Sequence, residues 1–98
     1  MNLLDIINLV KEKNLTKSQI EEYHADLTNL YALMQLELAE VRKAKALYWI
    51  ENRKETDVAT GRAWAVTEEG LREIDLSHEA KAAEKLLSSL RSRLYSTY

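Results

Sequence analysis

The chain contains no proline and only two glycines among its 98 residues, and these are the two residue types that most strongly interrupt helices. Alanine, leucine, glutamate, lysine and arginine are abundant instead, which favours helix along nearly the whole length. The length is enough for one domain and not for two. The composition therefore predicts an all-α protein in which residues 1–98 form a single helical domain.

Cysteine is also absent, which excludes disulfide bonds, thiolate chemistry and zinc sites built from cysteine. A chain without cysteine fits a reducing compartment, and we expect a cytoplasmic protein. The apolar start of the chain is interrupted by Asp5 and follows no basic segment, so it does not resemble a signal peptide. No window approaches the roughly 18 apolar residues of a membrane span, and we expect no membrane partner.

The first apolar pattern predicts a short helix over residues 3–13. Leu3, Ile6, Ile7 and Val10 fall at helical spacing and would form one face. So short a helix is not stable alone, and we expect it to dock on the core of the rest of the chain. An amphipathic helix that binds a groove or a membrane surface is the alternative, although its polar face carries few of the cations that membranes attract.

A capping box predicts the start of a second helix. Thr16 has the N-cap side chain and Gln19 follows three residues later, while Leu15 and Ile20 flank them as a hydrophobic staple. No strong breaker follows until about residue 53, and a helix over 17–53 would be roughly 55 Å long. Its apolar residues recur in a heptad-like pattern, which needs an apolar surface to cover it.

The segment 52–70 holds both glycines and separates this helix from a third one. Thr56 and Asp57 can each cap a helix, and Thr67, before two glutamates, offers a second start. Either a tight turn at 53–56 joins two long helices, or a loop continues to residue 66. We expect the turn, and therefore a third helix over 57–95 that packs antiparallel to the second.

Three segments of the chain together resemble a class of small, all-helical proteins encoded by bacteriophages, most of them uncharacterised. They read AEVRKAKALYWI, TDVATGRAWAVTEEG and EAKAAEKLLSSLRSRLYS. In that class a long helix is followed by a Thr-Asp/Val-Ala start and by a second long helix with a Leu-Arg-x-x-Leu-Tyr/Ser tail. The resemblance covers roughly residues 38–96. It implies a non-enzymatic accessory role, in some cases near recombination genes, and supplies no site residues.

Two carboxylate–histidine pairs are the best metal candidates. Glu21 and His24 lie one helical turn apart on the second helix, as do Asp75 and His78 on the third, which resembles half of a di-metal site in a helical bundle. A turn centred near residue 55 would leave the two pairs about eight residues, or roughly 12 Å, out of register. Only a dimer could bring them together, so we expect no metal and no other cofactor.

Catalytic constellations are missing from the sequence. There is no cysteine nucleophile and no Ser-His pair in a local motif, and the carboxylates fall on helix faces that solvent covers. A helical hairpin also has little room for a concave pocket with convergent polar groups. We therefore expect no enzymatic activity.

Cations and aromatic residues gather near the predicted turn. The formal net charge of −2 excludes a chain that is basic throughout, but it allows such a local patch. Cations bind phosphates and aromatic rings stack on bases, so single-stranded nucleic-acid binding in phage recombination or replication is our alternative function. The interpretation that we favour is structural, with the aromatic rings in the core and the basic stems covering it. The patch comprises Arg42, Lys43, Lys45, Trp49, Arg53, Lys54, Arg62 and Trp64.

The long apolar stripes favour a protein that binds proteins. One hairpin with a short extra helix cannot cover all of them, and off the seam Leu33, Leu36, Leu47 and Ile50 widen the apolar surface of the second helix. We expect a homo-oligomer, or else a small inhibitor or assembly factor that binds a host or phage protein. The expected partner seam consists of Ile20, Leu27, Met34, Leu38, Val41, Leu86, Leu90 and Leu94.

Overall fold

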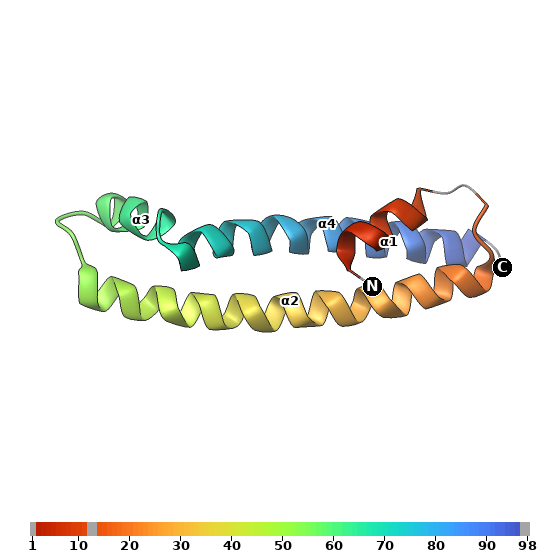
Figure 1. Ribbon diagram of the computed structural model, residues 1–98, viewed down its shortest axis with the longest axis horizontal. Helices are drawn as coiled ribbons and strands as arrows, with labels where there is room; N and C mark the ends of the chain where they lie inside the picture. The colour runs from red at the N-terminus through yellow and green to blue at the C-terminus, as the bar shows by residue number, and fades with distance from the viewer. Residues whose placement is uncertain (1, 12–13, 97–98) are drawn as a thin grey trace.

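The computed structural model describes residues 2–11 and 14–96, and these residues form four helices and no strand. The long helices α2 (Lys17–Asn52) and α4 (Glu68–Ser96) run antiparallel as the two arms of a hairpin (Figure 1). Helix α1 (Leu3–Val10) packs on both arms, and α3 (Asp57–Ala65) lies at the turn end. The predicted all-α hairpin with a short N-terminal helix is confirmed. The molecule measures 57 × 21 × 18 Å.

Helix α1 begins with a capping box that the sequence analysis did not identify. The Asn2 side chain accepts a hydrogen bond from the backbone N–H of Asp5 at 2.9 Å, and the Asp5 carboxylate accepts one from Asn2 at 3.3 Å. Asp5 therefore caps the helix that it seemed to interrupt. Ile6 and Val10 are buried, which confirms that this helix docks on the core.

The predicted range of 3–13 for the first helix is too long. The helix ends at Val10, and Lys11 is its C-cap, while residues 12 and 13 lie outside the described part of the chain. Arg93 of α4 donates a hydrogen bond from Nη1 to the carbonyl oxygen of Val10 at 3.0 Å. A helix leaves its last carbonyls without intrahelical partners, and the guanidinium supplies one here.

The start of α2 matches the prediction. The Thr16 hydroxyl accepts a hydrogen bond from the backbone N–H of Gln19 at 3.1 Å, and the Gln19 side chain accepts one from the N–H of Thr16 at 2.9 Å. Leu15 and Ile20 both pack in the core. At the other end α2 stops at Asn52, one residue before the predicted end, because the backbone of Arg53 is not helical.

The prediction of one helix over 57–95 is wrong, because the chain breaks between α3 and α4. The turn at 53–56 is confirmed, with the Thr56 hydroxyl capping α3 through the N–H of Ala59 at 3.1 Å, so no loop runs on to residue 66. The break follows at Val66. The Thr67 hydroxyl accepts from the N–H of Gly70 at 3.0 Å and donates to the carbonyl of Trp64 at 2.6 Å. These side-chain bonds replace the helical ladder and begin α4.

Gly70 permits the close packing at this break. A Cβ atom at this position would lie 2.0 Å from the carbonyl oxygen of Trp64, which no side chain can occupy. At Gly61 an added Cβ would lie 3.4 Å from the Trp49 ring, an ordinary contact. The two glycines therefore differ in role, and only Gly70 is required by its neighbours.

The predicted seam is the core of a single chain. Its members on α2 face the apolar residues of α4 and α1, and the core also includes Ile6, Leu76 and Ala83. A partner chain would find this seam already covered, because the arms of one hairpin bury it against each other. The buried seam residues are Ile20, Leu27, Met34, Leu38 and Leu90, and the partly buried ones are Val41, Leu86 and Leu94.

Candidate interaction surfaces

The four metal candidates do not form a site. Glu21, Asp75 and His78 are exposed, and His24 is half-buried. Among the described residues, no three histidine or acidic side chains lie close enough together to hold a metal ion. The Nε2 atom of His24 is buried and has no hydrogen-bond partner in the described part of the chain.

One of the two tryptophans of the basic patch is buried in the interior of the protein. Trp64 is only 2% exposed, and its ring packs against Tyr48 with the centroids 5.4 Å apart and the planes at 59°. Its indole N–H donates to the Glu73 carboxylate at 3.1 Å. Because the ring is buried and its polar edge is bound, Trp64 cannot stack on a base. A buried tryptophan needs such an acceptor, but nothing in the sequence identified Glu73.

Glu73 also binds a cation of the patch. The same Oε1 atom lies 3.2 Å from Lys45 Nζ, which sits 5.8 Å from the centroid of the Trp49 ring. Lys45 therefore joins the two arms of the hairpin and covers an aromatic ring. This part of the patch has the structural role that we favoured.

The other cations of the patch lie at the surface. Lys43 pairs with Glu40 at 3.3 Å and Arg53 with Asp57 at 4.0 Å, and such exposed pairs contribute little to stability. Arg42, Lys54 and Arg62 are exposed as well. A shallow groove of about 390 Å³ is lined by Arg42, Lys45, Ala46 and Trp49. Only this small part of the predicted patch keeps cations beside an accessible ring.

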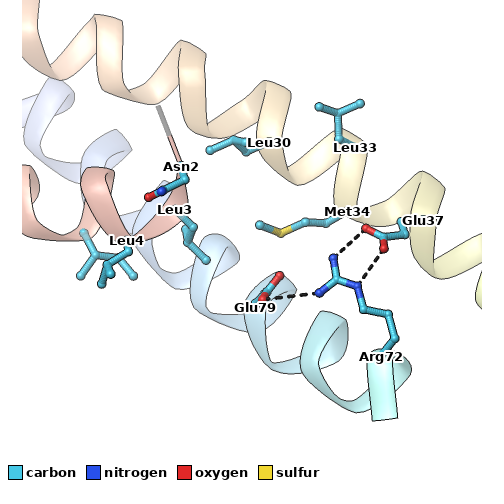
Figure 2. Close-up of a pocket in the computed structure, with 10 residues that line it drawn as sticks. Asn2, Leu3, Leu4, Leu30, Leu33, Met34, Glu37, Arg72 and Glu79 are labelled. Atoms are coloured by element: carbon cyan, nitrogen blue, oxygen red, sulfur yellow. Dashed lines mark hydrogen bonds and ion pairs between the residues drawn. The ribbon is translucent and has the colours of Figure 1, made fainter. Parts of the chain in front are cut away.

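A larger groove of about 560 Å³ lies between α1, α2 and α4 (Figure 2). Its apolar wall includes Leu3, Leu30 and Met34, and Arg72 closes one end. Arg72 forms a two-pronged bond to Glu37, at 2.8 and 2.9 Å, and lies 3.8 Å from Glu79. The charged groups of this groove therefore bind one another.

The Arg72–Glu37 pair was missed by the sequence analysis. In a hairpin that turns near residue 55, the numbers of two facing residues sum to about 110. The numbers 37 and 72 sum to 109, so the register of the two helices could have indicated this ion pair. The hydrogen bond from Arg72 lowers the pKa of the Glu37 carboxyl. Farther along the hairpin, the Tyr31 hydroxyl donates to Glu84 of α4, and this bond raises the pKa of Tyr31.

A long apolar surface lies on the side of α2 that faces away from α4. In the described part of the chain α1, α3 and α4 all lie on one side of α2 (Figure 1). The exposed fractions of Leu33, Leu36, Leu47 and Ile50 are 62%, 66%, 59% and 79%. Leu33 also lines the groove between α1, α2 and α4 (Figure 2). We call this surface the outer face of α2, with Glu40 and Lys43 between its two apolar ends.

Smaller apolar patches lie near the α3–α4 break. Val66 is 77% exposed and Leu71 is 54% exposed, and Val58 and Ile74 are exposed as well. These residues are dispersed over two short segments rather than aligned along one helix. None of the helices in the described ranges is long and apolar enough to cross a bilayer.

No protein-family model, no curated protein and no solved structure matches this chain.

Proposed function

We propose that this protein is a non-enzymatic interaction protein and that it associates with itself. The outer face of α2 is the observation that supports this proposal. Single exposed leucines are common on proteins, but here four large aliphatic side chains lie along one face of one helix. Water contact with this surface is unfavourable, and a helix from another chain would remove it.

The arrangement of the core also supports an interaction role. Because α1 and α4 cover the seam of α2, the fold does not need a partner to bury its own core. The apolar residues on the outer face therefore contribute little to folding. An exposed apolar face that the fold does not need is better explained by binding to another chain than by a role in folding. A host or phage protein bound on the same face is the alternative partner.

Sedimentation tests the proposal directly. The wild-type protein should show a mass of at least twice 11.3 kDa at tens of micromolar. The double variant Leu36→Asp, Leu47→Asp should be a monomer with an unchanged helical circular dichroism spectrum, because both side chains are exposed. Ser88→Asp, Ser89→Asp is the matched control, since it adds the same charge to an exposed part of α4.

The outcome against the proposal is equally clear. A wild-type protein that stays at 11.3 kDa over this range rejects self-association and leaves only a different protein as partner. Loss of association in the serine control as well would show that added charge, rather than the outer face, decides the result.

A further inference from the structure

We infer that the outer face of α2 binds a second copy of itself in antiparallel orientation, about a twofold axis that passes between residues 41 and 42. This inference rests on the proposed function, because it names the partner and the geometry of the same surface. Two features of the face support it: the spacing of its residues and the order of their charges.

The spacing is that of a helix seam. The residues of the outer face follow one another at intervals of three, four, three, four and three, which keeps them in one line along a helix. The line runs over 18 residues, from 33 to 50, which is a rise of about 26 Å along α2. It consists of Leu33, Leu36, Glu40, Lys43, Leu47 and Ile50.

The order of apolar and charged positions along this line is the same when it is read in either direction. Residues whose numbers sum to 83 form matched pairs: Leu33 with Ile50, Leu36 with Leu47, and Glu40 with Lys43. Two copies that cross at the midpoint of this line therefore place aliphatic side chains against aliphatic side chains. Each Glu40 then lies opposite Lys43 of the second copy.

The charges select the antiparallel arrangement over the parallel one. In a parallel pair in register, Glu40 would lie against Glu40 of the second copy and Lys43 against its Lys43, which is repulsive. In the antiparallel pair the two acids and two bases alternate around the axis. Within one chain Glu40 and Lys43 are 3.3 Å apart and 74% exposed, so both are free to turn toward a second copy.

The flank of the line allows the two helices to come close. Ala32, Ala39 and Ala46 recur every seventh residue beside it and are all exposed. Small side chains at such positions leave room for a neighbouring helix. The resulting assembly is a flat layer in which two α2 helices lie in the middle and the two α4 helices lie outside.

Disulfide formation between cysteine variants measures the register. The chain has no cysteine, so single variants give an unambiguous result. Leu36→Cys and Leu47→Cys should cross-link when mixed under mild oxidation, because residue 36 of one copy faces residue 47 of the other. Neither variant should cross-link alone, since two copies of residue 36 would be 11 residues, or about 16 Å, apart, well beyond disulfide reach. Self-cross-linking of Leu36→Cys overturns the antiparallel arrangement.

Charge exchange provides a second, independent measurement. Glu40→Lys and Lys43→Glu should each weaken self-association by roughly tenfold, because each creates two like-charge contacts per dimer. The double variant Glu40→Lys, Lys43→Glu should restore it. The inference is overturned if the single variants associate like wild type, or if the self-association of the double variant remains weak. Circular dichroism checks that every variant is folded.

The two proposals fail in different ways. A wild-type protein that stays monomeric, with no cross-link in any mixture, overturns self-association itself and this inference with it. An associating wild type whose cross-links or charge variants follow another pattern overturns only the antiparallel arrangement and leaves the proposed function standing.

Discussion

Arg93, near the end of α4, donates a hydrogen bond from Nη1 to the backbone carbonyl of Val10, the last residue of α1, at 3.0 Å. The two residues are 83 positions apart, so this contact joins the first and last helices of the chain. Basic side chains near the C-terminal end of a helix interact favourably with its dipole, and Arg93 lies in the last turn of α4. The structure shows that Arg93 also stabilises the C-terminal end of another one.

Replacing Arg93 should loosen the docking of α1. We expect Arg93→Met to lower the free energy of unfolding by about 1 kcal/mol, because it keeps most of the apolar stem and removes the bond to a helix end. Hydrogen exchange should increase in α1 more than in the middle of α2. Arg91→Met is the matched control, since Arg91 is exposed and two residues away. Equal effects of the two variants would contradict this role of Arg93.

The two glycines should respond oppositely to alanine. Gly70→Ala should destabilise the protein by about 3 kcal/mol or more, because its methyl group would overlap the carbonyl of Trp64 and force α3 away from α4. Gly61→Ala should be neutral or stabilise by up to about 1 kcal/mol, since alanine favours helix and its methyl group fits beside Trp49. Urea unfolding measures both values. A tolerated Gly70→Ala would show that the α3–α4 break is not held by this close approach.

The Glu37–Arg72 pair should make stability depend on pH in the acid range. Arg72 lowers the pKa of Glu37 in the folded protein below its value of about 4.3 in the unfolded chain. The stabilisation is therefore fully present above the unfolded pKa and is lost as the pH falls through the folded pKa. Because the pair is nearly half exposed, the effect should be small and sensitive to salt.

Urea unfolding of wild type and Glu37→Gln at several pH values tests this dependence. The wild type should be the more stable of the two at pH 7, and the difference should shrink below about pH 4.3. Glu51→Gln is the control, because Glu51 is exposed and forms no ion pair within the described ranges. A difference between wild type and Glu37→Gln that does not change with pH would contradict the assignment.

Nucleic-acid binding should be weak. With Trp64 in the interior and Lys45 bound to Glu73, we expect no binding of single-stranded DNA or RNA above the non-specific level at physiological salt. The triple variant Arg53→Ala, Lys54→Ala, Arg62→Ala should behave as wild type. Fluorescence anisotropy with labelled strands at two salt concentrations is the measurement. Salt-sensitive, sub-micromolar binding that the triple variant loses would establish our alternative function instead.

Local signals predicted much of this fold. The capping box at Thr16 and Gln19 depends on atoms three residues apart, and so does the cap at Thr56, so both can be identified without knowing the rest of the chain. The heptad-like seam predicted a long helix with an apolar partner. The similar length of the third predicted helix made an antiparallel hairpin the simplest solution.

The break at Val66 could not be predicted in the same way. Thr67 was recognised as a second helix start, but a continuous helix over 57–95 was equally consistent with local propensity. The choice depends on contacts at the end of the hairpin, where Trp64 packs against Tyr48 and binds Glu73. Gly70 then allows the backbone of α4 to approach Trp64.

Local sequence patterns are enough to predict that this protein is helical, where α2 begins, where the chain turns and which face of α2 is apolar, because periodicity and capping act over a few residues. Tertiary packing, in contrast, settles which apolar residues the chain itself covers. It buried the seam of Leu27 and Leu38 and left Leu36 and Leu47 exposed. Burial depends on which helix lies opposite, and that is a property of the whole packed chain rather than of any segment.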